Sequence, residues 1–126
     1  MISHTTLGTN DLEKADGFYR NILTEIGGTQ IHKSEKVMFW QFDETGTKLS
    51  ISLPFDGEPA SHGNGSMVAL KLNSIDKVQE VYSMAMAMAM ALGGTCEGKP
   101  GERYNGAFYG AYFRDLDGNK IAIFYR

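Results

Sequence analysis

The stretch RDLDGNKIAIF at 114–124 has a counterpart in FDETGTKLSIS at 42–52. When the two are aligned, Asp115, Gly118, Lys120 and Ile123 coincide with an Asp, a Gly, a Lys and an Ile of the earlier stretch. In both, an Asp and a Gly precede alternating apolar residues, a pattern that predicts a hairpin turn followed by a strand. A short chain that contains the same turn and strand twice indicates an internal duplication.

Two further blocks repeat in the same order. The block SHTTLGTNDLEKADGFY at 3–19 aligns without gaps with SMVALKLNSIDKVQEVY at 66–82, and IGGT at 26–29 corresponds to LGGT at 92–95. Three matched blocks in one order are difficult to obtain by chance. We therefore interpret residues 1–126 as a single domain made of two repeat units, about 1–60 and about 61–126.

Each repeat unit predicts the element order βαβββ. An apolar stretch comes first, then a residue that can cap a helix (Asn10 in the first unit, Asn73 or Ser74 in the second). A double glycine then ends each helix, because glycine adopts positive φ without penalty. Strands are expected at 2–7, 29–33, 37–43 and 48–53, and again at 67–72, 95–99, 107–115 and 120–125, with hairpin turns at Thr45-Gly46 and Asp117-Gly118.

Both helices are expected to bury one face. In the first, intervals of three and four residues predict that the buried face consists of Leu12, Ala15, Phe18, Tyr19, Ile22 and Leu23. The run SMAMAMAMALGG at 83–94 alternates like a strand, but Met and Ala favour helices, and its position in the repeat predicts one. This second helix is expected to be about one turn longer. Its predicted buried face is Val78, Val81, Tyr82, Ala85, Ala89 and Leu92, with some of the methionines facing outward.

The composition is that of a globular protein with one core, since 42% of the 126 residues are hydrophobic and 21% are charged. The net charge of -3 and the lack of a basic cluster argue against nucleic acid or anionic membrane as a partner. No apolar run is long enough to span a bilayer, and Cys96, the single cysteine, cannot form an internal disulfide. These features predict a cytoplasmic protein.

Two apparent binding motifs fail on inspection. RDLDGNK could be read as a calcium loop, but Lys120 and Arg126 stand where that loop needs Gly and Glu. GGTCEGKP at 93–100 fits a phosphate loop until Pro100 replaces the required Ser or Thr. Neither stretch therefore predicts an ion or phosphate site.

The tandem βαβββ units, FYRNIL at 18–23 and the ending YFRDLDGNKIAIFY at 112–125 give the chain a family resemblance. It resembles the glyoxalase / bleomycin-resistance / extradiol-dioxygenase superfamily, whose members are also called vicinal oxygen chelate proteins. The resemblance covers essentially the whole length. It implies an α+β fold in which the two units form a curled mixed sheet around a central cleft, with the helices on the outer face. It also implies a homodimer that binds a small molecule.

Members of this superfamily that use a metal carry four ligands, usually His or Glu, on the first and last strands of each unit. The repeat alignment assigns these positions to His4, Ser50, Met67 and Ala122. Only His4 has a side chain of a metal-binding type, whereas a divalent ion ordinarily needs three or more N, O or thiolate donors from the protein. We therefore expect that the usual metal site is largely lost and that no cofactor is bound, with a metal held by atypical donors as the disfavoured alternative.

The alternation of side chains along the strands, phased by these four positions, predicts which residues share the cleft face. The predicted ligand-binding residues are His4, Thr6, Ser50, Ser52, Met67, Ala69, Tyr104, Phe108, Tyr112, Ala122 and Phe124. Tyr104 belongs to EGKPGERYNG at 97–106, which is expected to be a loop over the mouth of the cleft. His32 and His62 fall outside the repeated positions and are expected on the surface.

The favoured function is the binding of a small aromatic or amphiphilic molecule in an apolar cleft. The alternative is a glyoxalase-like lyase, isomerase or dioxygenase. Such an enzyme would use an atypical metal site, for instance His4 with Glu97 or Glu102, or metal-free acid–base catalysis by His4. A third hypothesis treats the Met-rich helix as a surface that docks another protein.

Overall fold

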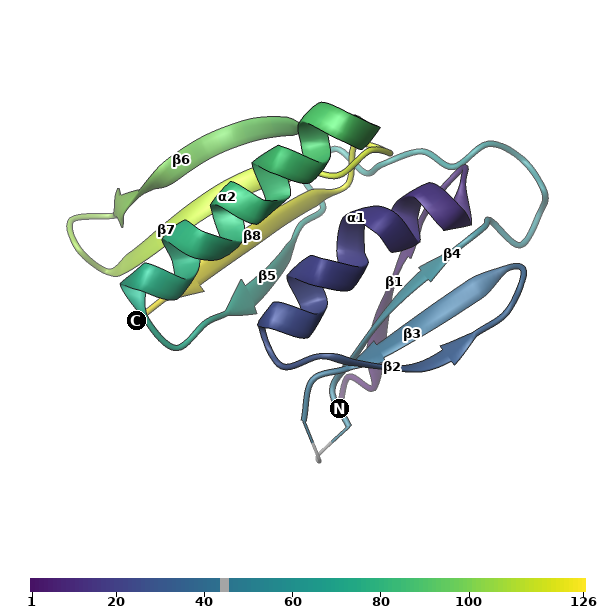
Figure 1. Cartoon of the computed structure of the whole chain (residues 1–126), viewed down its shortest axis with the longest axis horizontal. Coiled ribbons are helices and arrows are strands. Elements are labelled where there is room, and N and C mark those ends of the chain that lie inside the picture. Colours follow the sequence, from purple (N-terminus) through teal and green to yellow (C-terminus); the bar gives the residue numbers. More distant parts are fainter. Residues whose placement is uncertain (44–45) are drawn as a thin grey trace.

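A computed structural model describes residues 1–43 and 46–126, and its elements follow the order βαβββ twice (Figure 1). Module one contains β1 (His4–Gly8), α1 (Leu12–Glu25), β2 (Thr29–Lys33), β3 (Val37–Gln41) and β4 (Lys48–Ser52). Module two contains β5 (Val68–Lys71), α2 (Ile75–Leu92), β6 (Thr95–Arg103), β7 (Phe108–Arg114) and β8 (Lys120–Tyr125). The predicted α+β class with two βαβββ modules is confirmed. Thr45 of the predicted first hairpin turn lies outside the described residues.

Each module forms one four-stranded mixed sheet, and the two sheets have the same strand order. The orders are β1-β4-β3-β2 and β5-β8-β7-β6. In both sheets the first strand of the module pairs in parallel with the last, and the remaining pairs are antiparallel. The positions matched by the sequence repeat therefore occupy equivalent places in the two sheets.

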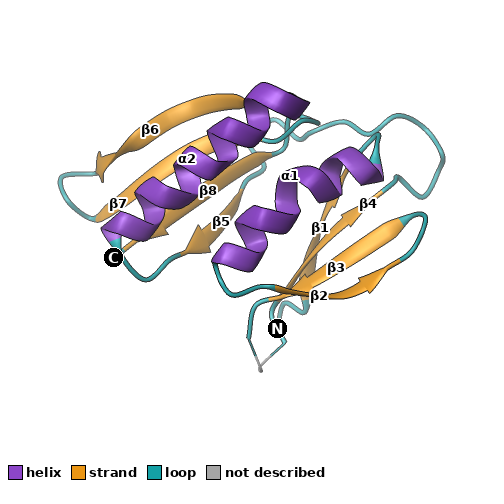
Figure 2. Cartoon of the chain, viewed as in Figure 1, coloured by secondary structure: helices purple, strands orange, loops and turns teal. Residues whose placement is uncertain are grey.

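The two helices contact each other and lie on the same side of the sheets (Figure 2). All six residues predicted for the buried face of α1 are buried. In α2, Val78, Val81, Ala85 and Ala89 are buried, while Tyr82 and Leu92 are partly buried against the same core. The sheets contribute Leu49, Ile51, Ile121 and Ile123 to this core, as the alternation predicts. One hydrophobic core thus lies between the helices and both sheets.

The repeated Asp-Gly turn of module two fastens the modules together. The Asp115 carboxylate accepts hydrogen bonds from the Asp117 and Asn119 amides and from the Tyr19 hydroxyl of α1. The Asn119 side chain donates to the carbonyl of Gly8, at the end of β1. Gly118 has a φ of +86°, and a Cβ added there would lie 2.6 Å from Nδ1 of His62. The turn therefore needs glycine both for its backbone angle and for the approach of His62.

Of the two predicted helix caps, the one for α1 is wrong and the one for α2 is confirmed. Asn10 does not cap α1, since the side chain of Asp11 accepts from the amide of Lys14 instead. Asn10 is used for a long-range contact: its side-chain oxygen accepts from the Ala60 amide at 2.7 Å. In module two, Ser74 caps α2 through the amide of Lys77, one of the two predicted caps.

The prediction of a loop over the cleft at 97–106 is wrong for residues 97–103. They belong to β6, which extends to Arg103 and pairs with β7 through an irregular register. Gly98 and Gly101 sit at the register shifts, and the long strand ends in a tight turn at Tyr104 and Asn105. The Gly and Pro residues, which suggested a loop, are accommodated at irregular positions of an edge strand.

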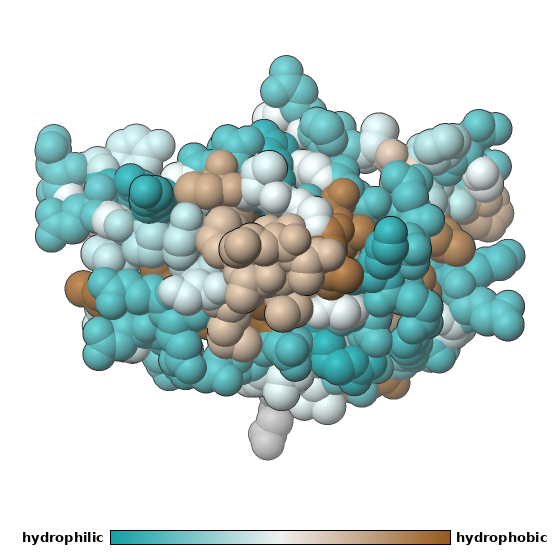
Figure 3. Space-filling view, turned by 45° about the horizontal axis from the view of Figure 1, so that its top comes forward, coloured by the Kyte–Doolittle hydropathy of each residue, from teal (hydrophilic) through white to brown (hydrophobic). Residues whose placement is uncertain are grey.

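The Met-Ala run forms the C-terminal part of α2, and the helix is 18 residues long against 14 for α1. This confirms the predicted extra turn. Because a helix advances 100° per residue, alternate alanines fall on opposite sides: Ala85 and Ala89 are buried, whereas Ala87 and Ala91 are exposed. Met90 is 92% exposed. Figure 3 shows the resulting apolar patch over α2. Within the described residues, neither helix is both long and apolar enough to cross a membrane.

Candidate functional site

The residues predicted to bind ligand lie in two groups, one on each sheet. Leu49, Ile51, Ile121 and Ile123 point toward the helices, so their strand neighbours point to the opposite sides, which we call the helix-free faces. Thr6 and Ser50 are register partners in the first sheet, and Ala69 and Ala122 are register partners in the second. The strand periodicity therefore places the two groups at matching points of the two modules.

The helix-free face of the first sheet carries an aromatic cluster around Phe39. The ring of His4, from β1, meets Phe39 of β3 edge to face with centroids 5.3 Å apart, and the ring of His32, on the adjacent β2, lies 6.2 Å from Phe39. His4 Nδ1 also lies 3.1 Å from the hydroxyl of Ser3. Both imidazoles are exposed. His32 is on the surface as predicted, yet it contacts the same ring as His4.

Ser50 lies beneath this cluster. It is the register partner of both Thr6 and Phe39, and only 1% of the residue is exposed. Its hydroxyl has no hydrogen-bond partner among the described residues. A buried polar group without a partner costs about 1–3 kcal/mol. Because it is buried, the hydroxyl is not on the surface that a bound molecule would contact.

The second sheet carries a row of three aromatic rings. Tyr104 lies 5.7 Å from Phe108, and Phe108 lies 5.7 Å from Phe124, measured between ring centroids. The tilted and edge-to-face arrangements are those that aromatic rings prefer. Beside the row, Ala122 pairs with Tyr112 on one side and with Ala69 on the other. Tyr112 is therefore in line with two small side chains of the second sheet.

A cavity of about 610 Å³ lies beside Tyr112, and we call it the Tyr112 cavity. It unites Met67, Tyr104 and Tyr112 from the sequence prediction with Glu97, Gly98, Glu102, Arg103 and Lys120. The Arg103 guanidinium carbon and the Lys120 ammonium lie 5.4 Å and 5.3 Å from the centroid of the Tyr112 ring. Both distances are in the range of cation–π contacts. The cavity therefore combines an aromatic wall with two cations.

The electrostatics of the Tyr112 cavity depend on Arg114, which follows Tyr112 on the helix-free face of β7. Arg114 Nε donates to Glu97 at 2.7 Å. This hydrogen bond and charge, together with the nearby charge of Lys120, hold the pKa of the Glu97 carboxyl below its usual value. Glu97 is therefore ionised at neutral pH and is already paired within the protein.

Tyr104 is held at the cavity by an unusual backbone. Tyr104 and Asn105 have φ values of +51° and +56°, a region that residues other than glycine seldom adopt. The turn nevertheless places the Tyr104 ring against Phe108 and leaves the residue 79% exposed. Strained backbone that persists in this way is often found at ligand sites.

The four positions at which the resemblance implies metal ligands do not fit a divalent ion. His4 offers an imidazole, but Ser50 offers a hydroxyl, Met67 a thioether and Ala122 a methyl group. Among the residues that the structure describes, no group of three or more His, Cys, Asp or Glu side chains could hold a metal. Two of these positions, Ser50 and Ala122, are also buried, at 1% and 4% exposure.

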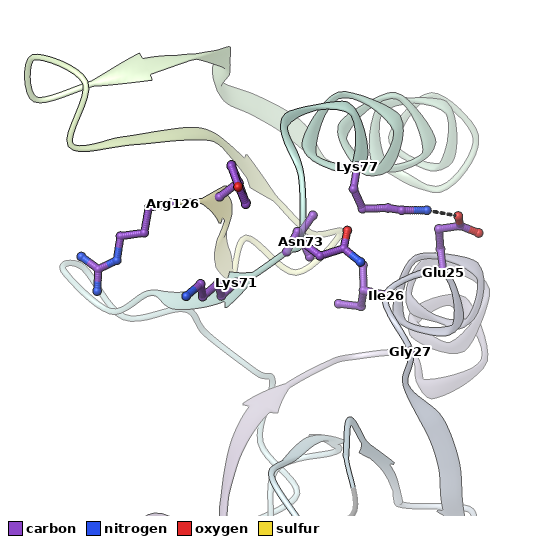
Figure 4. A pocket seen from close by; sticks show the side chains of 9 residues that line it. Glu25, Ile26, Gly27, Lys71, Asn73, Lys77 and Arg126 are labelled. Carbon is purple, nitrogen blue, oxygen red and sulfur yellow. Dashed lines mark hydrogen bonds and ion pairs between the residues drawn. The ribbon is translucent and has the colours of Figure 1, made fainter.

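Two other cavities mark the seam between the modules. One of about 230 Å³ is lined by Thr6 from β1 and by Met67 and Lys120 from module two, so it connects the two groups of predicted residues. The other, of about 620 Å³, lies where α1 ends and α2 begins (Figure 4). There Lys77 and Glu25 form an ion pair of 2.7 Å across the two helices. No residue predicted to bind ligand lines this second cavity.

The sequence prediction missed Arg103 and Lys120. Lys120 could have been found, because it is two residues before Ala122 and four before Phe124 on the same strand. Arg103 could not, since the stretch around it was expected to be a loop. Its place beside Tyr112 depends on β6 extending to Arg103 and on the two register shifts in that strand.

The chain was compared with known proteins. A family model described as the Glyoxalase/Bleomycin resistance protein/Dioxygenase superfamily matches residues 1–123. None of the curated proteins matches the chain. Among solved structures, a glyoxalase/bleomycin resistance protein from Albidiferax ferrireducens is 35% identical, with a TM-score of 0.81 and coverage of 100% of this chain and 98% of that one.

Two more distant structures share the fold. A glyoxalase-related enzyme from Fulvimarina pelagi is 21% identical with a TM-score of 0.78, and it covers 100% of this chain and 88% of its own. A glyoxalase/bleomycin resistance protein/dioxygenase family enzyme from Burkholderia phytofirmans is 18% identical with a TM-score of 0.72. The match covers 98% of this chain and 96% of that one. The match over nearly the whole chain and the two βαβββ modules agree: this protein belongs to the glyoxalase/bleomycin resistance protein/dioxygenase superfamily.

Proposed function

We propose that this protein binds a small aromatic or amphiphilic molecule on its helix-free faces, chiefly in the Tyr112 cavity. The observation that carries the proposal is the Tyr112 cavity of about 610 Å³, whose lining residue Tyr104 also begins the aromatic row that continues through Phe108 to Phe124. Ligand sites in proteins have volumes of about 300–1,000 Å³ and are lined by apolar and aromatic groups with a few polar ones. The Tyr112 cavity has a volume in this range and two tyrosines in its lining, and four of its eight lining residues are charged.

The donor set supports binding rather than metal chemistry. Of the four positions that carry ligands in metal-dependent relatives, only His4 retains a donor of the required kind. A metal shared by His4 and Glu97 would have to displace Arg114, which lies 2.7 Å from the Glu97 carboxylate. We therefore propose that the usual metal site is lost. Stoichiometric zinc, nickel, manganese or iron in protein purified without a histidine tag would overturn this, and elemental mass spectrometry measures it.

We also propose that two copies pair through the helix-free faces. Met67 is 48% exposed and Tyr104 is 79% exposed although both belong to the candidate site. Large apolar side chains exposed together are typical of a surface that another molecule covers. Light scattering after gel filtration should give twice the mass of one chain. The mass of a single chain at micromolar concentration would contradict the pairing.

Binding can be tested with phenylnaphthylamine, a neutral aromatic probe whose fluorescence rises in apolar surroundings. We expect saturable binding that Phe108→Ala weakens about five- to tenfold, because the variant loses ring contacts on both sides of position 108. Met90→Ala is the control, since Met90 is 92% exposed on α2 and does not line the Tyr112 cavity. Equal affinity of both variants, or no saturable binding to the wild type, would contradict the proposal.

A further inference from the structure

Lys120 is a cation that lines the Tyr112 cavity, where its charge helps to lower the pKa of the Glu97 carboxyl. Its ammonium lies 5.3 Å from the Tyr112 ring centroid. In the described part of the chain, no carboxylate forms an ion pair with it. Glu97, which lines the same cavity, is engaged by Arg114 at 2.7 Å. The charge of Lys120 is thus held in place by an aromatic ring and remains available to a ligand.

Arg103 is a second cation with unused hydrogen-bonding capacity. Its guanidinium carbon lies 5.4 Å from the Tyr112 centroid, and Nη2 donates to the carbonyl of Lys99. Its Nε is buried and has no partner among the described residues. Buried donors are normally satisfied, and arginine donors match oxyanions especially well. Its guanidinium therefore lies beside the Tyr112 ring with one donor that the described residues do not use.

The charges around the cavity favour an anion. The lining has two positive side chains, Arg103 and Lys120, and two negative ones, Glu97 and Glu102. Arg114, which does not line the cavity, pairs with Glu97 and offsets its charge. Glu102 is exposed, so water weakens its field, whereas Arg103 and Lys120 are half-buried. Two cations that share one aromatic ring also repel each other. An anion between them removes this repulsion and gains a charge-assisted hydrogen bond from each.

From these observations we propose that the Tyr112 cavity recognises the oxyanion of its ligand, a carboxylate, phosphate or sulfonate attached to an aromatic or apolar body. Lys120 and Arg103 bind the oxyanion, and the row of Tyr104, Phe108 and Phe124 binds the body. The inference rests on the proposed function and specifies its ligand class. It assigns to Lys120 a role in selecting anionic over neutral molecules of the same shape.

The test compares two fluorescent probes that differ by one charged group: anilinonaphthalene sulfonate and neutral phenylnaphthylamine. Both are titrated into the wild type and into Lys120→Gln, Lys120→Arg and Lys99→Gln. Lys99 is the matched control because it is exposed on the neighbouring β6 and does not line the cavity. Lys120→Arg retains the charge and reports whether a loss in Lys120→Gln comes from misfolding.

We expect the wild type to bind the sulfonate about five- to tenfold more tightly than the neutral probe, as for one or two partly exposed charge contacts. Lys120→Gln should reduce this preference to about twofold or less, while Lys99→Gln and Lys120→Arg keep it. Added salt should weaken the binding of the sulfonate probe and leave that of the neutral probe unchanged. Equal affinities in the wild type, or a preference unchanged in Lys120→Gln, would overturn the oxyanion site and leave the proposed function standing. If neither probe binds, the proposed function fails as well.

Discussion

The hydroxyl of Tyr19 donates to the carboxylate of Asp115 at 2.5 Å, and both residues are buried, at 1% and 3% exposure. Tyr19 belongs to α1 of module one and Asp115 to the turn between β7 and β8 of module two. Burial raises the pKa of the Asp115 carboxyl, although hydrogen bonds from Tyr19, Asn119 and the Asp117 amide oppose the shift. The motif that repeats in the sequence therefore serves, in its second copy, to join the two modules.

Tyr19→Phe should destabilise the protein by about 1.5–3 kcal/mol, because it removes a buried hydrogen bond to a charged group without creating a cavity. Urea denaturation measures the change in the free energy of unfolding. Tyr125→Phe is the matched control: Tyr125 is 37% exposed and should change stability by less than about 0.5 kcal/mol. Equal effects of the two variants would show that the Tyr19–Asp115 contact does not join the modules.

Gly118→Ala should cost more than Gly106→Ala. Both glycines have positive φ, +86° and +83°, so each substitution incurs backbone strain of about 1 kcal/mol. Only at Gly118 would the new methyl group meet a neighbour, His62. We expect the excess cost to disappear in a His62→Ala background, which thermal denaturation of the single and double variants can measure. An excess that persists without His62 would refute the steric explanation.

The contribution of Asp16 to stability should depend on pH. Burial raises the pKa of its carboxyl, but hydrogen bonds and charges from Arg20 and Lys33 outweigh this and lower it below the unfolded value of about 3.9. A lowered pKa stabilises the folded state above that value, and the gain is lost as pH falls through the folded pKa. Asp16→Asn should therefore cost about 1 kcal/mol at pH 7, and the difference from wild type should shrink below about pH 4. Urea denaturation at both pH values measures this difference, and one that grows in acid would contradict the assignment.

The Met-Ala run offers a test of how α2 is oriented. Ala85 is fully buried and Ala87 is exposed, although their sequence surroundings are nearly identical. Ala85→Leu should overpack the core and destabilise by about 1–3 kcal/mol, whereas Ala87→Leu should change stability by less than about 0.5 kcal/mol. Calorimetric melting temperatures of the two variants measure the contrast. Similar melting temperatures would mean that the run does not present these two alanines to opposite sides.

Much of the fold could be predicted because periodicity and repetition carry its information. The buried face of α1 followed from intervals of three and four, and the helical state of the Met-Ala run followed from its place in the repeat rather than from its own alternation. The errors were local. Asn10 and Asp11 are both good capping residues, and only the long-range contact of Asn10 with Ala60 decides between them. In β6, pairing with β7 outweighs the Gly and Pro signals.

The candidate site was less predictable than the fold. Alternation placed Phe108, Tyr112, Ala122 and Phe124 on one face, since a strand's geometry fixes that directly. The sequence could not show that Arg103 crosses to the Tyr112 ring or that the Ser50 hydroxyl lacks a partner. Both features depend on register shifts within strands and on side chains that come from different strands.

The most direct test of the central claim is a map of amide chemical-shift changes when phenylnaphthylamine binds to isotopically labelled wild-type protein. The account predicts that the largest changes lie in β7 and β8, Phe108–Arg114 and Lys120–Tyr125, and in the turn at Tyr104. Changes centred on the Met-Ala patch of α2, or scattered over the molecule, would contradict a ligand site on the helix-free face.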